Sequence, residues 1–155
     1  MSGMHSLNHS AMPVRDMEEA AAFYCEVLGA TPFIHTTYEI GRAKTGSGVF
    51  RSFVIGDFLL ALTVARKVLD MPPDDQFRGA HGIRHGFQVS RAQFDEIIRN
   101  LDARGIPHQG PIEHPEAGPF GESVYFKDPS GNFLEFIWRR DEADLPEDRQ
   151  YISPE

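Results

Sequence analysis

The sequence is poor in cysteine and in long apolar stretches. Cys25 is the only cysteine among 155 residues, so no disulfide can form within one chain. No apolar run reaches the roughly 18 residues that a membrane-spanning helix needs. The N-terminus also lacks the charged-then-apolar pattern of a secretory signal. We therefore expect a cytoplasmic protein that does not span a membrane.

Basic residues are in the minority. The chain has 15 Lys and Arg against 23 Asp and Glu, a formal net charge of −8, and no basic cluster longer than the pair Arg139 and Arg140. Nucleic acids and anionic membrane surfaces bind to basic patches, so neither is an expected partner. The remaining composition, 41% hydrophobic and 25% charged, is that of a globular protein with a real core.

The first half of the chain predicts one strand, one helix and three further strands. A strand at residues 6–14 leads to Asp16, and Glu19 follows at the spacing of a capping box. Apolar residues at three- and four-residue steps then predict a helix that Gly29 ends. Three strands are expected after it, at residues 31–40, 48–55 and 58–65.

The same order of elements recurs in the second half. A strand at 84–89 leads to Ser90 and Gln93, again a capping box, and Gly105 ends the helix. His85 precedes Gly105 at the spacing that separates His9 from Gly29, so the pattern predicts a βαβββ repeat. Further strands are expected at 106–112, 122–127 and 132–138. The predicted organisation is a first module at 1–65, a connector at 66–80, a second module at 81–140 and an acidic tail at 141–155 whose role stays open.

The last predicted hairpin carries a recognisable motif. Residues 125–135 read YFKDPSGNFLE, and this segment, together with the repeat and a His in the first strand of each module, resembles the vicinal oxygen chelate superfamily. That superfamily includes glyoxalase I, extradiol dioxygenases, fosfomycin-resistance enzymes and bleomycin-binding proteins. The resemblance covers residues 6–138. It implies an α+β fold in which two βαβββ modules form a cupped, incomplete mixed β-barrel of the glyoxalase/dioxygenase type.

The resemblance also implies one divalent metal ion, held by His9, His85 and Glu135. Strand alternation places Glu135 in an apolar strand on either face, and a buried carboxylate needs a cation, a hydrogen bond or a proton. His85 aligns with Phe87 and Val89 on an inward face. Two imidazoles and one carboxylate suit Fe2+ or Mn2+, with Zn2+ or Ni2+ as alternatives. Either His alone is more simply a core residue, so the prediction depends on the set of three.

A fourth ligand position of the superfamily aligns with Ala61, which cannot bind a metal. This vacancy weighs against glyoxalase I chemistry. The fosfomycin enzymes also fit poorly, because Ala11 stands where a Thr is expected, Asp144 lies where an Arg is expected, and residues 48–53 offer no Glu as a base. Both sub-families therefore lose support.

Extradiol-type dioxygenase chemistry is the leading expectation, with a small bidentate oxygen compound as substrate. Those enzymes keep two His and one Glu, with a Tyr at the position of Tyr125, which predicts a catalytic role for this residue by hydrogen bonding. They are longer than this chain, however, and their additional acid-base His has only His114 as a loose match. The alternatives are a lyase, isomerase or epimerase of the glyoxalase type, or a metal-free drug-binding protein of the bleomycin-resistance type.

We further expect a homodimer, because such modules leave sheet edges that a second copy covers. Whether a metal site lies within one chain or is shared across the dimer is left open by the sequence.

Overall fold

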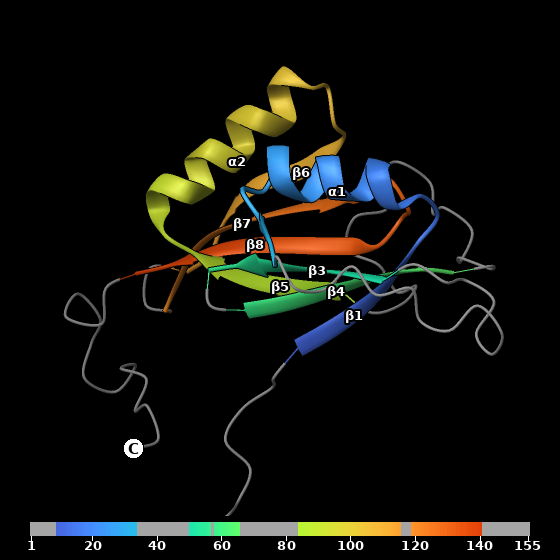
Figure 1. Cartoon of the computed structure of the whole chain (residues 1–155). Coiled ribbons are helices and arrows are strands. Elements are labelled where there is room, and N and C mark those ends of the chain that lie inside the picture. Colours follow the sequence, from blue (N-terminus) through green and yellow to red (C-terminus); the bar gives the residue numbers. More distant parts are fainter. Residues whose placement is uncertain (1–8, 34–49, 57, 66–83, 116–118, 141–155) are drawn as a thin grey trace, which may run out of the picture. The chain divides into compact units, whose positions relative to one another are not determined.

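The computed structural model describes residues 9–33, 50–56, 58–65, 84–115 and 119–140 (Figure 1). The chain divides into two compact units. The first comprises Met1–Met71 with the turn Asp128–Asn132, and the second comprises Pro72–Lys127 with Phe133–Glu155.

In the described part of the first unit there are one four-stranded mixed sheet and one helix. The sheet order is β1-β4-β3-β2, with β1 parallel to β4 and the other pairs antiparallel. Helix α1 begins after Asp16, whose side chain accepts a hydrogen bond from the Glu19 backbone N–H at 2.8 Å, as the capping box predicts. The elements are β1 (His9–Val14), α1 (Met17–Glu26), β2 (Thr31–Pro32), β3 (Phe50–Ile55) and β4 (Phe58–Val64).

A buried polar cluster ties α1 to the turn of the last hairpin. The Tyr24 hydroxyl donates to Asp128 Oδ2 at 3.0 Å, and Asp128 also accepts from the Asn132 side chain at 2.7 Å and the Ser130 backbone N–H at 2.9 Å. Burial raises the pKa of Asp128, and these hydrogen bonds oppose that rise. The predicted turn is confirmed, since Gly131 donates its N–H to the Asp128 carbonyl and has a φ of 90°.

The second unit repeats this arrangement. Its sheet order is β5-β8-β7-β6, with β5 parallel to β8 and the other pairs antiparallel. Helix α2 begins after Ser90, whose hydroxyl accepts from the Gln93 N–H at 3.2 Å. The elements are β5 (Arg84–Val89), α2 (Arg91–Ala103), β6 (His108–Glu113), β7 (Phe120–Lys127) and β8 (Phe133–Arg139).

One face of the second sheet is an apolar layer beneath α2. The Phe136 ring stacks on Phe87 and Phe126 with centroid distances of 5.1 and 5.6 Å. Helix α2 contacts β8, and Figure 1 shows it lying across the strands of this sheet. Its buried side chains complete the layer: Phe94, Ile97 and Leu101. Side chains on this face are therefore committed to the core.

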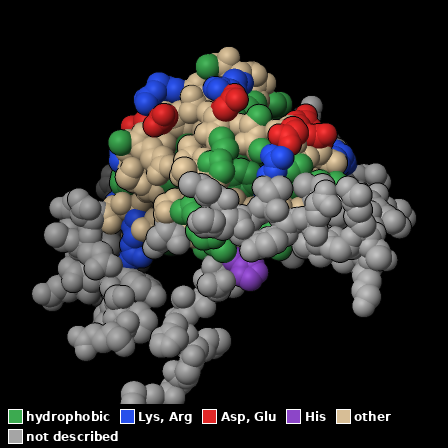
Figure 2. All heavy atoms as spheres, viewed as in Figure 1, with side chains coloured by type: hydrophobic (Ala, Val, Ile, Leu, Met, Phe, Trp, Pro, Cys, Tyr) green, Lys and Arg blue, Asp and Glu red, His purple; other side chains and the backbone are tan. Residues whose placement is uncertain are grey.

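The predicted α+β fold with two βαβββ modules is confirmed. Strand β7 begins at Phe120, two residues before its predicted start. Strand β6 begins at His108, two residues after its predicted start. Most of the predicted strand 31–40, the connector 66–80 and the tail 141–155 lie outside the described residues. Neither described helix is long and apolar enough to cross a membrane. In the view of Figure 2, acidic and basic side chains are interspersed over the described surface.

Candidate functional site

The strand registers place the two modules in correspondence, residue by residue. In the first unit Ala11 lies opposite Ala61 across the parallel pair β1–β4, and in the second unit Gly86 lies opposite Glu135 across β5–β8. Ala61 therefore occupies in the first module the position that Glu135 occupies in the second. Ala61 is also the residue that the sequence aligned with a fourth ligand position, and the first module thus has a methyl group where the second has a carboxylate.

The same correspondence matches His9 with Arg84. Each is the first residue of the first strand of its module, and both are exposed. The residues that follow them, Ser10 and His85, are half-buried and begin the inward alternation of the two strands. By strand position, the equivalent of His9 is thus Arg84, one residue before the His85 that the sequence prediction used.

His85 and Glu135 lie on opposite faces of the second sheet. A Cβ atom at Gly86 would lie 3.7 Å from Glu135 Oε2, so Glu135 shares the face of Gly86. The neighbouring residue Phe87 stacks on Phe136 in the layer beneath α2, and alternation places His85 on that layer's side. The structure therefore does not bring this predicted ligand pair together on one face, and His9 belongs to the other unit.

We call the face opposite α2 the Glu135 face, defined by Arg84, Gly86, Ser123, Tyr125 and Glu135. The Glu135 side chain is 14% exposed and both carboxylate oxygens have partners. Oε2 lies 3.0 Å from Arg84 Nε, and Oε1 accepts from the Ser123 hydroxyl at 2.9 Å. The Arg84 guanidinium also lies over the Tyr125 ring, 5.1 Å from its centroid. A cationic partner and hydrogen bonds thus accompany this carboxylate, as its partial burial demands.

Tyr125 lies directly opposite Glu135 across the antiparallel pair β7–β8, where the sequence prediction placed it. The side chain is buried, and burial is the main reason that the pKa of Tyr125 is raised. Its hydrogen bond with Glu135 raises this pKa further, while Ser123 and Arg84 act in the opposite direction. The phenol therefore stays protonated near neutral pH and donates to the carboxylate. Its catalytic role stays a prediction.

His114 extends this network beyond the sheet. Its Nε2 lies 2.8 Å from the Ser123 hydroxyl oxygen, and Ser123 in turn donates to Glu135. The Ser123 hydroxyl donates its proton to Glu135. In the contact between His114 Nε2 and the Ser123 oxygen, the proton therefore belongs to His114 Nε2. The result is a relay of polar groups from His114 through Ser123 to the carboxylate.

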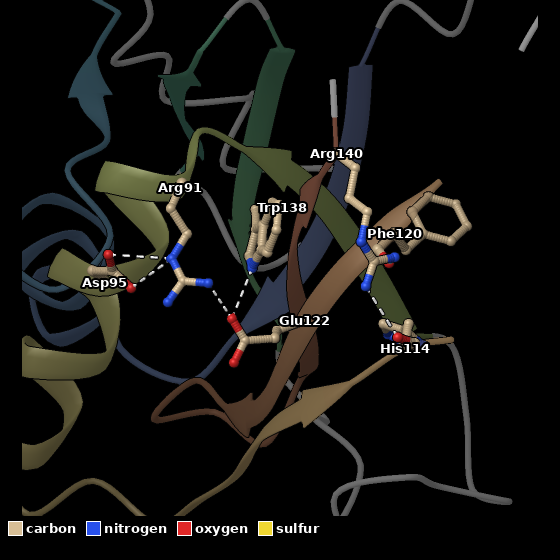
Figure 3. A network of polar contacts seen from close by, with 7 residues as sticks. All are labelled: Arg91, Asp95, His114, Phe120, Glu122, Trp138 and Arg140. Carbon is tan, nitrogen blue, oxygen red and sulfur yellow. Dashed lines mark hydrogen bonds and ion pairs between the residues drawn. The ribbon is translucent and has the colours of Figure 1, made fainter. Parts of the chain in front are cut away.

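Arg140 holds the segment that carries His114. Its Nη2 donates to the His114 carbonyl at 3.1 Å, and its Nη1 donates to the Phe120 carbonyl; Figure 3 draws these three residues. Nη1 also donates to the Pro115 carbonyl at 3.0 Å. The His114 ring lies edge-on to Phe120. These contacts hold the backbone at His114, Pro115 and Phe120, so Arg140 positions the imidazole beside Ser123.

A second part of the network in Figure 3 fastens α2 to the sheet. Arg91 forms ion pairs with Asp95, at 3.1 Å, and with Glu122. Glu122 also accepts from Trp138 Nε1 at 3.0 Å, and the Arg91 guanidinium lies over the Trp138 ring. This cluster joins the start of α2 to β7 and β8 and does not include residues of the Glu135 face.

Sequence reasoning missed Arg84 and Ser123. The signal for Arg84 was present, because Val14 follows His9 at the same distance at which Val89 follows Arg84. Counting to the helix-ending glycines selected His85 instead, since the loops and helices of the two modules differ in length. Ser123 left no comparable signal, because nothing in its neighbours distinguishes a buried hydroxyl from an ordinary strand residue.

The model of the Glyoxalase/Bleomycin resistance protein/Dioxygenase superfamily matches residues 6–136. The chain belongs to this superfamily. A relative of known activity is the glutathione transferase FosA of Serratia marcescens, which is 26% identical over 85% of this chain and 79% of that protein. Transferase chemistry therefore occurs among the relatives of this chain, and this relative lends no support to the extradiol dioxygenase expectation.

Solved structures confirm the fold. A glyoxalase/bleomycin resistance protein/dioxygenase domain from Frankia matches with a TM-score of 0.67 and 21% identity, covering 89% of this chain and all of that one. The fosfomycin resistance protein FosX of Listeria monocytogenes, in a mutant form complexed with Mn(II) and 1S,2S-dihydroxypropylphosphonic acid, matches with a TM-score of 0.59 and 21% identity, covering 86% and 92%. At this identity the likeness shows the fold alone.

Proposed function

We propose that the chain is an enzyme that binds a small oxygen-bearing molecule on the Glu135 face. The observation that carries this proposal is the Glu135 carboxylate, held between Arg84, Ser123 and Tyr125 from neighbouring strands. A half-buried carboxylate with a protonated phenol beside it offers a proton acceptor and a proton donor at one place. A buried phenol with a raised pKa, lying beside this carboxylate, favours a functional site over a purely structural cluster.

A small phosphonate is the substrate class that we propose, with fosfomycin as the first compound to test. The names of the relatives motivate this choice, and Arg84 supports it. Its side chain is 43% exposed, and a guanidinium has several N–H donors, so the contact with Glu135 leaves donors for an oxyanion. This proposal reverses the sequence argument against fosfomycin enzymes, which depended on single residues such as Ala11.

The reaction that we propose is addition of a thiol or of water to the epoxide of such a substrate. The nucleophile bonds to carbon, the C–O bond of the ring opens, and the proton of the nucleophile passes to the released oxygen. Glu135 is placed to accept that proton and Tyr125 to donate one to the oxygen. The proposal uses no metal ion, because His85 and Glu135 lie on opposite faces of their sheet. The ions suggested by the sequence, Fe2+ or Mn2+, stay predictions.

A second candidate is binding without turnover, as in a drug-binding resistance protein. The ion pair between Arg84 and Glu135 favours it, because both oxygens of the carboxylate are already occupied, one by Arg84 and one by Ser123. Both candidates use the same face and differ in whether the ligand is changed.

The test is to incubate fosfomycin with the full chain and glutathione, cysteine or water alone, and to follow the phosphorus NMR signal. We expect product in at least one mixture, with loss of turnover in Glu135→Gln. The matched control is Glu113→Gln, which changes an exposed carboxylate at the end of β6. Binding without product would select the second candidate, and neither binding nor product would refute fosfomycin as the ligand.

Homodimer formation stays a prediction. Within the described residues, each sheet ends in edge strands, β1 and β2 in one and β5 and β6 in the other. Exposed edges are commonly covered by another chain or element. Analytical ultracentrifugation should give twice the mass of one chain at micromolar concentration, and a stable monomer would contradict the prediction.

A further inference from the structure

Arg84 stands where the repeat would place a second histidine. It corresponds to His9 in strand position and in the alternation of exposed and buried residues. The adjacent His85 belongs to the side of the sheet where Phe87 and Phe136 stack. The Glu135 face therefore presents a guanidinium beside its carboxylate, and no imidazole from β5 reaches that face.

The charge of Arg84 is incompatible with a divalent ion at the same place. Metal ligands must offer an electron pair, and a guanidinium has only N–H donors. Its Nε lies 3.0 Å from Glu135 Oε2, so a metal ion on this oxygen would meet a positive charge at close range. The other oxygen, Oε1, is taken by the Ser123 hydroxyl.

We infer that Arg84 takes the place of a divalent metal ion on the Glu135 face, and that this face binds a phosphonate or carboxylate group directly through the guanidinium. A planar guanidinium matches the oxygens of such groups with paired hydrogen bonds. The ligand half of this inference rests on the proposed function. The metal half does not depend on any substrate, so the two can fail separately.

Metal titration tests the first half. The full chain is stripped with EDTA and titrated with Mn(II), followed by electron paramagnetic resonance, and with Co(II), followed by absorption. We expect no stoichiometric binding by the unaltered chain or by His85→Gln. Arg84→His should strengthen binding by roughly tenfold or more, because it places an imidazole diagonally across from Glu135 on the same face. One equivalent of Mn(II) bound by the unaltered chain, and lost in both His85→Gln and Glu135→Gln, would overturn the inference.

Calorimetry with fosfomycin tests the second half. We expect the same Kd in EDTA and in Mn(II), and a Kd about tenfold weaker or more in Arg84→Gln. The control Arg51→Gln removes an equally charged side chain from an ion pair in the first unit, and should bind as the unaltered chain does. Circular dichroism checks that each variant folds. Binding that requires added Mn(II) would overturn the inference. Absence of fosfomycin binding in every condition, with the metal result as expected, would reject the phosphonate and leave the replacement of the metal by Arg84 standing.

Discussion

The two modules share one backbone plan and differ in what they place on it. The central row of the first sheet joins Ala11, Ala61 and Ser52, whereas the matching row of the second joins Gly86, Glu135 and Tyr125. The first row is small and nearly apolar, and the second carries a carboxylate and a phenol.

This difference shows how a duplicated module divides its tasks. Fold is maintained in both modules by the inward face, where Met12 and Leu62 in one correspond to Phe87 and Phe136 in the other, and all four are buried. The candidate functional groups lie on the opposite face, which carries Glu135 and Tyr125 in the second module. The polar groups have gathered on the second module, so variants there should affect function more than their counterparts in the first.

The largest effect on function is expected from removing the hydroxyl of Tyr125 in the second module. Tyr125→Phe should lower turnover by about 10² to 10⁴, the usual range for a positioned acid-base or hydrogen-bonding group. Because the ring and its burial are kept, the fold should be unchanged. The measurement is kcat on the substrate that the fosfomycin assay identifies, beside a thermal melt.

The matched control is Ser52→Ala, which removes a hydroxyl from the equivalent position of the first sheet. It should leave kcat unchanged. If Tyr125→Phe kept full activity, or lost activity only through lost stability, the catalytic role of Tyr125 would be rejected.

The order of helices and strands in the two modules could be predicted from the sequence. The face of the sheet on which each side chain lies could be predicted only in part. Capping residues predicted where both helices begin, and strand alternation placed Glu135 and Phe136 on different faces correctly. The structure places His85 and Glu135 on opposite faces, because a shift of one residue reverses the face of a strand side chain. Such a shift leaves no trace in composition, and it becomes visible only when strand partners such as Gly86 are known.

Core truncation should have the next largest effect. Phe136→Ala removes a fully buried ring stacked on Phe87 and Phe126, and should cost about 3 to 5 kcal/mol of unfolding free energy. Its counterpart Leu62→Ala should cost about 2 to 5 kcal/mol, toward the lower end because a smaller side chain is lost.

Urea unfolding followed by circular dichroism measures both core variants. The single tryptophan, Trp138, lies in the second unit, so its fluorescence adds a probe of that unit alone. A fluorescence midpoint that shifts more in Leu62→Ala than in Phe136→Ala would contradict the expected order of the two costs.

The buried polar cluster of the first unit should give a smaller and pH-dependent effect. Tyr24→Phe removes one hydrogen bond to Asp128 and should cost about 1 to 3 kcal/mol at neutral pH. The cost should shrink in acid, because the bond favours the ionised form. Urea unfolding at several pH values measures it.

The sign of the background pH dependence follows from the raised pKa of Asp128, whose main cause is burial. Between its usual value of 3.8 and its value in the folded chain, the folded state binds more protons than the unfolded state. The contribution of Asp128 to stability therefore falls as pH rises through this window. In Asp128→Asn the free energy of unfolding should not show this decrease with rising pH. A decrease of the same size in that variant would mean that another group causes it.

The smallest expected effect concerns the ion pair between Arg51 and Glu18 in the first unit. The Glu18 side chain is 77% exposed, although Arg51 lowers the pKa of its carboxyl by hydrogen bonding and by charge. Water and salt screen such a pair, and ordering two long side chains offsets the remaining attraction. Glu18→Gln should therefore leave the melting temperature unchanged within error at both low and high salt. A loss at low salt that disappears at high salt would show that an exposed pair in the first module stabilises the fold, and would weaken the view that charge matters mainly on the second.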